Sequence, residues 1–187
     1  MVALANETDC MTDNYKLTPI QRTLDEGGLI LYPTDTIWGV GCDATNQAAV
    51  ERIYELKNRD RSKPLVLLVS SIEMLKCYVQ HVHPRVETLL QHHRQPLTFI
   101  YDKAQNLPEC LLGPGGSVAI RIPHDDYCKN IIEEFGKPLV ATSANISNEP
   151  FPRYFGEISS HIIQGVDFVV KHRQGDKTMG APSVIAK

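Results

Sequence analysis

Two short segments that lie far apart in the sequence carry side chains suited to binding a polyphosphate. The first contains Lys57 and Arg59, and the second contains Ser143 and Asn145. Lysine supplies a compact ammonium group, and arginine supplies a planar fork that bonds two oxygens at once. The serine hydroxyl and the asparagine amide add neutral, directional hydrogen bonds. If the fold brings the two segments together, these residue types predict a site for a triphosphate.

The first segment has a simpler explanation as the solvated end of a helix. Residues 57–63 carry four cations and one acid, Asp60, and runs of charge are usually exposed. Read alone, the segment supports solvation and phosphate binding equally. A buried strand is expected directly afterwards, at 64–70, which places the segment in a loop above a sheet edge. That position favours a binding site.

A third polar segment follows a strand expected at 29–33. Thr34, Asp35 and Thr36 would lie at the carboxyl end of that strand, where open α/β sheets form ligand sites. Two hydroxyls and a carboxylate can hold a small zwitterion such as an amino acid. On these residues alone, an ordinary turn that begins at Pro33, with Asp and Thr bonding their own backbone, is the better explanation.

Two further positions are equally open to a structural explanation. Arg121 lies inside the apolar run 117–123, where a charge is costly unless it meets a partner. A role in binding a carboxylate and a snorkelling or ion-paired arginine on an edge strand fit this position equally well. Serine and asparagine are common in turns, so a polar cap after the strand expected at 138–144 is the better explanation of Ser143 without further observations.

Strands alternate with helices along residues 18–187, which we expect to form a single domain after a loose N-terminal arm at 1–17. Helices are expected near 18–27, 46–57, 72–79, 84–92, 125–135 and 155–163. Strands are expected at 29–33, 64–70, 96–102, 117–123, 138–144 and 167–172. This alternation predicts an α/β sheet with parallel segments, and the hairpin-like neighbours among the strands make the sheet mixed.

Local signals mark several helix ends. Thr18 can cap the first helix with Pro19 in its first turn, and Asn46 or Thr45 can cap the second helix after a glycine-containing loop at 39–46. Gly136 closes the helix that begins near residue 125. These signals make the helix boundaries the best-defined part of the predicted fold.

The composition is that of a soluble globular protein, with 42% hydrophobic and 22% charged residues among 187. The net charge of -3 excludes nucleic-acid binding through bulk positive charge, so any RNA contact needs a local patch. Five widely spaced cysteines without a CxxC pair, and seven histidines without ligand spacing, argue against a disulfide framework and a zinc site. Neither an apolar run of about 20 residues nor a signal peptide is found. We expect a cytoplasmic protein with no membrane partner.

Four motifs in this order resemble the YrdC domain family, whose members include threonylcarbamoyl-adenylate synthases. They are PTDTIWGVG at 33–41, KNRDRSKPL at 57–65, KPLVATSANIS at 137–147 and APSVI at 181–185. The resemblance covers about residues 18–185 and implies a YrdC-like twisted open mixed sheet flanked by helices. The implied reaction joins L-threonine, bicarbonate and ATP, with Mg²⁺, into threonylcarbamoyl-adenylate and pyrophosphate. The product would serve the t6A modification of tRNA.

The resemblance also implies roles for individual residues. For ATP binding it implies Lys57, Arg59, Lys63, Ser117, Ser143 and Asn145. Lys57 and Arg59 would also act in catalysis, by stabilising the phosphates. For threonine binding it implies Thr34, Thr36, Arg121 and Ser183. The residues that contact magnesium stay unknown.

The sequence departs from the family pattern at several points. Trp38 stands where tyrosine is common, Val184 replaces the threonine of the last motif, and residues 93–96 replace a Trp-Pro-Gly-Pro segment. The sequence also stops at Lys187, before the longer tail of the family. Other t6A-pathway proteins, and tRNA or double-stranded RNA, are candidate partners. Two rival functions are a YrdC-like RNA- or nucleotide-binding paralogue that makes no adenylate and a scaffold subunit of a tRNA-modifying complex.

Overall fold

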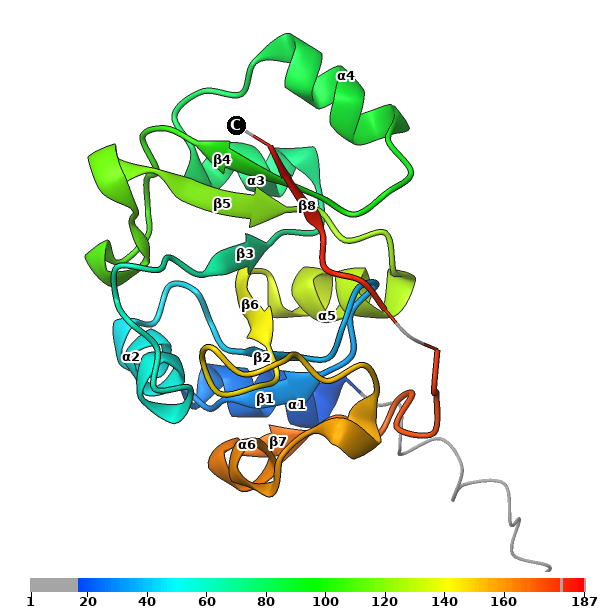
Figure 1. The fold of residues 1–187 in the computed structure, drawn as a ribbon. Helices are drawn as coiled ribbons and strands as arrows, with labels where there is room; N and C mark the ends of the chain where they lie inside the picture. Colours follow the sequence, from blue (N-terminus) through cyan, green and yellow to red (C-terminus); the bar gives the residue numbers. More distant parts are fainter. Residues whose placement is uncertain (1–16, 179, 187) are drawn as a thin grey trace, which may run out of the picture.

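Eight strands form one mixed sheet in the order β7-β1-β2-β6-β3-β5-β4-β8, drawn in Figure 1. The computed structural model describes residues 17–178 and 180–186 of the chain. The strands are β1 (Ile30–Tyr32), β2 (Gly39–Gly41), β3 (Val66–Leu68), β4 (Leu97–Tyr101), β5 (Val118–Arg121), β6 (Leu139–Ser143), β7 (Phe168–Val169) and β8 (Val184–Ala186). The pairs β1–β7, β3–β5 and β4–β8 are parallel, and the other pairs are antiparallel. The sheet is therefore mixed, as expected.

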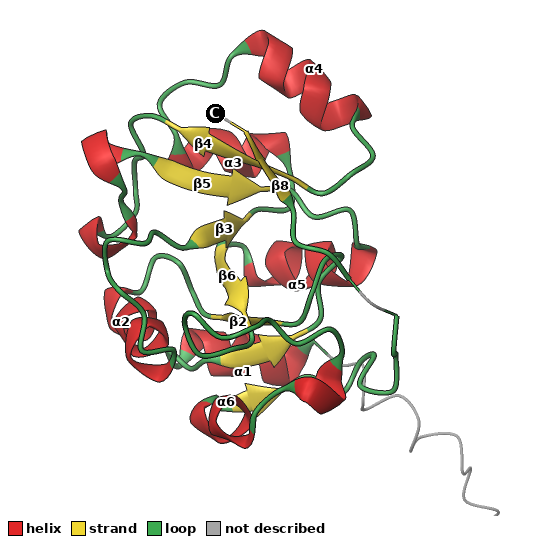
Figure 2. Ribbon diagram, viewed as in Figure 1, coloured by secondary structure: helices red, strands yellow, loops and turns green. Residues whose placement is uncertain are grey.

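Helices pack on both faces of this sheet, as the secondary-structure colouring in Figure 2 helps to follow. They are α1 (Thr18–Asp25), α2 (Gln47–Leu56), α3 (Ile72–Tyr78), α4 (Pro84–His92), α5 (Asp126–Phe135) and α6 (Ser160–Gly165). Short 3-10 turns lie at Glu109–Leu111, Pro114–Gly116 and Phe155–Glu157. The helix expected near 155–163 is thus a turn followed by α6.

Two apolar clusters hold the helices to the sheet. One cluster joins α1 and α5 to the face that carries Ile30 and Tyr32, and the other joins α2, α3 and α6 to the face that carries Leu31. Successive residues of a strand point to opposite faces, so β1 is buried on both sides. This double burial explains why its sequence is continuously apolar rather than alternating.

The helix ends follow the predicted signals with one exception. The Asn46 side chain accepts a hydrogen bond from the backbone N–H of Ala49 at 3.2 Å and caps α2. Gly136 has a φ of 74° and ends α5 in the left-handed conformation, which glycine adopts at little cost. Pro19 lies in the first turn of α1 as expected, but the capping position is Leu17 and no side chain caps this helix. The cap predicted at Thr18 was wrong.

Two strands of the sheet were not expected. The loop predicted at 39–46 begins with β2, which pairs with β1 and with β6. A side chain on Gly41 would come within 2.4 Å of the carbonyl oxygen of Val140, so glycine is needed for this close pairing. The edge strand β8 pairs with β4. The predicted N-terminal arm stays a prediction, because its residues 1–16 lie outside the described part of the chain.

The central strand β6 connects the two halves of the sheet. It pairs with β2 on one side and with β3 on the other. Its carboxyl end, Ser143, lies opposite Gly39 of β2. The loop that follows β6 therefore emerges between the segment after β1 and the segment after α2. This topology brings together the three polar segments that the sequence singled out.

Candidate active site

A cavity of about 250 Å³ opens where these segments meet. Six of the ten predicted site residues line it, namely Thr34, Thr36, Arg59, Arg121, Ser143 and Ser183. Apolar side chains, Phe151 and Ile185 among them, complete the wall. The fold therefore places hydroxyls and two guanidinium groups from five separate segments of the chain around one small space.

Arg59 reaches the cavity from the loop that follows α2. Asn58 has a φ of 46° and turns the chain in the left-handed conformation that asparagine tolerates. The Arg59 side chain donates to the carbonyl oxygens of Lys63 and Pro64, each at 3.0 Å. Burial lowers the pKa of Arg59, but arginine remains charged in proteins. These bonds hold the guanidinium group at the wall of the cavity and use only part of its five donors.

Lys57 lies behind the cavity wall and does not line it. Its ammonium Nζ donates to the carbonyl oxygen of Ser143, to that of Asn145 at 2.5 Å and to the Asn145 side-chain oxygen at 3.4 Å. The residue is 1% exposed. Burial and, to a smaller degree, the nearby charge of Arg59 lower the pKa of Lys57 to about 7. The two motifs that the sequence suggested for phosphate binding are thus in direct contact with each other.

The loop after β6 is held by its own hydrogen bonds as well. The Asn145 amide nitrogen donates to the carbonyl oxygens of Ile146 at 3.0 Å and Glu149 at 2.6 Å. The backbone N–H of Ser147 donates to the carbonyl oxygen of Lys57 at 2.8 Å. The Asn145 side chain is therefore turned toward the loop backbone, and Ser143 is the member of the pair that lines the cavity.

Hydroxyl groups from two further segments also line the cavity. The Thr34 hydroxyl donates to the carbonyl oxygen of Ile37 at 2.8 Å and lies 2.8 Å from the Thr36 hydroxyl. These are turn bonds of the kind that the residue types alone predicted. The Ser183 hydroxyl lies 2.8 Å from that of Thr98, a fully buried residue of β4. Thr98 was missed because a single threonine inside an apolar strand gives no functional signal.

Arg121 forms an ion pair with Asp35, and the two side chains are 5% and 9% exposed. The other carboxylate oxygen of Asp35 accepts a hydrogen bond from the backbone N–H of His124 at 2.9 Å. The Arg121 Nε is buried and has no hydrogen-bond partner within the described residues. Arg121 is therefore an ion-paired arginine that also lines the cavity. The sequence had singled out Asp35 with Thr34 and Thr36, but its pairing with Arg121 was not predicted.

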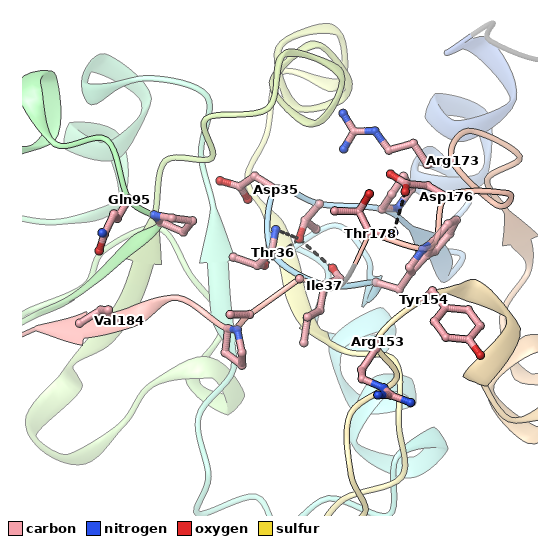
Figure 3. Close-up of a pocket in the computed structure, with 17 residues that line it drawn as sticks. Asp35, Thr36, Ile37, Gln95, Arg153, Tyr154, Arg173, Asp176, Thr178 and Val184 are labelled. Atoms are coloured by element: carbon pink, nitrogen blue, oxygen red, sulfur yellow. Dashed lines mark hydrogen bonds between the residues drawn. The ribbon is translucent and has the colours of Figure 1, made fainter.

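A second cavity of about 570 Å³ adjoins the first. The two share four lining residues, Thr34, Thr36, Ile37 and Pro182. Figure 3 shows the turn at Asp35, Thr36 and Ile37 at the centre of this second space. Its far side carries the side chains of Arg153, Tyr154, Arg173 and Asp176. No sequence motif pointed to these last four residues.

A family model named Sua5/YciO/YrdC and described as "Telomere recombination" matches residues 22–187. The chain belongs to this family. It is 32% identical over 178 residues to a protein of Pseudoalteromonas translucida named threonylcarbamoyl-AMP synthase, and the match covers 94% of both chains. A protein of an Enterobacter species with the same name is 33% identical, with 88% of this chain and 90% of that protein covered.

Solved structures of family members share the fold. Pyrococcus abyssi Sua5 in complex with L-threonine matches with a TM-score of 0.78 and 27% identity, over 91% of this chain and 48% of that one. A variant of the same Sua5 matches with a TM-score of 0.82 and 26% identity, over 92% of this chain and 53% of that one. The chain thus spans about half the length of these Sua5 structures. The resemblance to the YrdC family and the α/β fold are both confirmed.

Four of the six residues that the resemblance implied for ATP lie outside the lining of the cavity, namely Lys57, Asn145, Lys63 and Ser117. Lys63 donates to the side-chain oxygen of Asn148 at 3.1 Å, and the Ser117 hydroxyl donates to the carbonyl oxygen of Pro114 at 3.0 Å. Across residues 17–178 and 180–186, no group of three or more His, Cys, Asp or Glu side chains is arranged to hold a metal ion. Over the same residues, every helix is too short or too polar to span a membrane.

Proposed function

We propose that the chain is a threonylcarbamoyl-AMP synthase, which joins L-threonine, bicarbonate and ATP and releases pyrophosphate. The observation that carries this proposal is the 250 Å³ cavity, because residues of the phosphate-binding and threonine-binding motifs line it together. Two curated relatives that match about nine tenths of this chain carry that enzyme name. A structural relative is described in complex with L-threonine.

The cavity has two chemically different ends. The phosphate end consists of Arg59 and Ser143, which offer a cation and a hydroxyl. The threonine end offers hydroxyls and a second guanidinium group, from Thr34, Thr36, Arg121 and Ser183. The cavity is smaller than the roughly 300–1,000 Å³ typical of sites for drug-sized ligands. We therefore expect threonine to lie inside it and the nucleotide to extend beyond its mouth.

The reaction needs no nucleophilic side chain. The threonine amine condenses with bicarbonate to form a carbamate and water, and a carbamate oxygen attacks the α-phosphorus of ATP. The bond between the α-phosphorus and the bridging oxygen breaks, and pyrophosphate leaves with the electron pair. The protein contributes by holding the reactants in line and by balancing the charge of the phosphates. Arg59 is placed for the second task.

Threonine recognition follows from the Arg121 ion pair and from the hydroxyl groups. Asp35 neutralises much of the guanidinium charge, yet the Arg121 Nε–H keeps a donor without a partner in the described chain. A buried donor of this kind is costly unless a ligand satisfies it, and the threonine carboxylate is such an acceptor. We expect the hydroxyls of Thr36 and Ser183 to bond the threonine hydroxyl.

Magnesium enters this proposal as a companion of ATP. Mg²⁺ usually binds one or two carboxylates together with substrate phosphates. The carboxylate of the 34–36 turn, Asp35, already bonds Arg121 and the backbone of His124. We therefore expect the triphosphate and water to supply most magnesium ligands. Because the product would serve the t6A modification of tRNA, we further propose a cytoplasmic protein that works beside other t6A-pathway proteins, with tRNA or double-stranded RNA as additional partners.

Pyrophosphate release from ATP, measured with bicarbonate in the presence and absence of L-threonine, tests the function. We expect release that requires threonine, together with a product whose mass is that of threonylcarbamoyl-AMP. Valine serves as the control amino acid because it has the same branched shape without the hydroxyl, and we expect little turnover. ATP binding without pyrophosphate release would instead indicate a nucleotide-binding paralogue.

A further inference from the structure

Lys57 is a buried lysine whose hydrogen-bond partners, among the residues that the structure describes, are all neutral. The acceptors of its Nζ are two backbone carbonyl oxygens and the side-chain oxygen of Asn145. Lysine is almost never fully buried unless it is paired with an opposite charge, and this residue is 1% exposed. Such an arrangement is costly to fold, which indicates that the ammonium group has a specific task.

The geometry leaves the ammonium no donor for a substrate. An ammonium has three N–H donors, and the three acceptors of Lys57 all belong to the segment 143–145. A direct contact with a phosphate would require at least one of these bonds to break. Lys57 is also absent from the lining of both adjoining cavities, whereas Arg59, two residues later, lines the smaller one.

Lys57 holds the loop after β6 at two points. Its ammonium bonds the carbonyls of Ser143 and Asn145, and its own carbonyl accepts the backbone N–H of Ser147. Ser143 is the residue of this loop that lines the cavity. The end of α2 and the end of β6 are thereby locked together directly behind the phosphate end.

We propose that Lys57 is a positioning residue, whose ammonium fixes the loop 143–147 so that Ser143 faces the triphosphate while Arg59 makes the direct contact. The role rests on the proposed function, because it concerns the same ATP site. It differs from the direct phosphate contact that the sequence suggested for Lys57. Two models can therefore be separated: action through the loop and contact with the ligand.

Two substitutions of Lys57 separate the effect of losing hydrogen-bond donors from the effect of losing the charge. Lys57→Met keeps an unbranched side chain that is one atom shorter and removes its donors, whereas Lys57→Gln is neutral but keeps two N–H donors. ATP affinity is measured by calorimetry without threonine. Loss of a charge-assisted bond corresponds to roughly tenfold or more, so we expect that loss for Lys57→Met and a partial recovery for Lys57→Gln. Lys76→Met, at an exposed lysine paired with Glu87, is the matched control and should bind ATP normally. Equal losses in the Met and Gln variants would overturn the proposal.

A double-mutant cycle with Ser143→Ala gives the second readout. If Lys57 acts through the loop, Ser143→Ala should reduce ATP affinity clearly in the wild-type background and by less than about twofold in Lys57→Met, because the two residues act as one unit. Hydrogen exchange should quicken by about tenfold or more for the amides of 144–147 in Lys57→Met, with α1 and α5 unchanged. If the two substitutions reduce ATP affinity by factors that multiply in the double variant, and hydrogen exchange of the loop is unchanged, Lys57 contacts the ligand directly.

Lysine acetylation of the wild-type protein covers the case in which Lys57→Met does not fold. We expect Lys63 to react in the free protein, and Lys57 to stay unmodified both with and without Mg-ATP. A Lys57 that reacts in the free protein and is protected by Mg-ATP would contradict the proposal. All these measurements use ATP alone, so a protein that binds ATP but releases no pyrophosphate would refute the synthase and leave the test of Lys57 intact.

Discussion

Two buried cations on either side of the cavity are stabilised in opposite ways. Arg121 is 4% exposed and pairs with the carboxylate of Asp35. Lys57 is 1% exposed and meets carbonyl and amide oxygens alone. The threonine end is therefore close to neutral before a ligand binds, whereas the phosphate end keeps the uncompensated charges of Lys57 and Arg59.

This difference matches the charges of the proposed substrates. A threonine zwitterion carries no net charge, and a near-neutral site with one unsatisfied donor on Arg121 suits it. A triphosphate carries several negative charges, and an excess of positive charge in a partly buried site attracts it strongly. ATP would also raise the pKa of Lys57 again, because an anion nearby favours the charged form. Substitutions that change one cation and spare the other test this comparison.

The largest effect is expected from breaking the buried ion pair between Arg121 and Asp35. Asp35→Ala leaves the Arg121 guanidinium buried without an opposite charge, and such losses typically reduce the free energy of unfolding by about 3–5 kcal/mol. Urea unfolding measures the change. Glu26→Ala is the matched control, since its pair with Arg22 is mostly exposed and should contribute less than about 1 kcal/mol. A cost for Asp35→Ala as small as that of the control would show that Arg121 needs no partner.

Arg59→Ala should affect the nucleotide and spare the amino acid. A hydrogen bond to a charged group contributes about 1.5–3 kcal/mol, so ATP affinity should fall by roughly 10–100-fold. Threonine affinity should change less than about twofold, because the two ends of the cavity are formed by different segments. Calorimetric titration with each substrate gives both affinities. Arg22→Ala, at an exposed position of α1, is the control. Equal losses for ATP and threonine would contradict two separate ends.

The uncompensated charge of Lys57 should appear in the pH dependence of stability. Burial lowers the pKa of Lys57 to about 7 from an ordinary value of 10.5. Between these values the unfolded chain binds more protons than the folded one, so the free energy of unfolding should rise with pH through this window. The slope from one group is at most about 1.4 kcal/mol per pH unit. This contribution is lost as the pH falls through about 7.

Urea unfolding of the wild type and of Lys57→Met at pH 7, 8 and 9 isolates that slope. The wild type should gain stability relative to Lys57→Met as the pH rises, and Lys76→Met should follow the wild type. Parallel curves for the wild type and Lys57→Met would mean that the Lys57 ammonium is not strained by its burial.

A smaller effect is expected from changing Thr98, whose hydroxyl lies beside that of Ser183. Thr98→Val keeps the shape of the side chain and removes the partner of the Ser183 hydroxyl. The free energy of unfolding should fall by about 1 kcal/mol, and threonine affinity should fall several-fold while ATP affinity stays unchanged. Discrimination between threonine and valine should narrow, because a poorly oriented Ser183 loses directional contact with the substrate hydroxyl. Unchanged discrimination would place Ser183 outside the threonine contacts.

The predictable part of the fold was local. Asn46 and Gly136 marked helix ends correctly, because capping depends on residues within one turn. The strand β2 was not predictable in this way. Its Gly39 and Gly41 have low strand propensity, and the strand exists because Tyr32 and the backbone of Val140 pack where a side chain would be.

Most of the residues that line the site could be predicted from the sequence, but their hydrogen bonds and ion pairs could not. Motif residues converge on one cavity as expected, yet the acceptors of Lys57 lie 86 and 88 positions away in the sequence. Asp35 and Arg121 are likewise 86 positions apart. Which cation receives a carboxylate is decided by the strand order of the sheet, and residue types and spacing do not contain that information.

The smallest effect is expected for RNA binding by the basic segment 57–63. The sequence suggested four clustered cations, but Lys57 is buried, and Arg59 is only partly exposed, at the wall of the cavity. Arg61 pairs with Glu51, and Lys63 bonds the neutral Asn148. At most two exposed cations therefore remain to contact phosphates.

Titration of a labelled RNA duplex at rising salt measures how many cations take part. Each phosphate contact contributes a slope of about -0.9 to log affinity against log salt on a B-form duplex, so we expect weak binding with a total slope of roughly -1 to -2. A double Arg61→Ala and Lys63→Ala variant should remove this slope, with Lys76→Ala as the control. Mg-ATP should weaken the binding, because Lys63 is expected to contact the nucleotide. A steeper slope, or tight binding that neither salt nor Mg-ATP disturbs, would show that RNA is held by another surface and that the uncompensated charge at the phosphate end serves ATP alone.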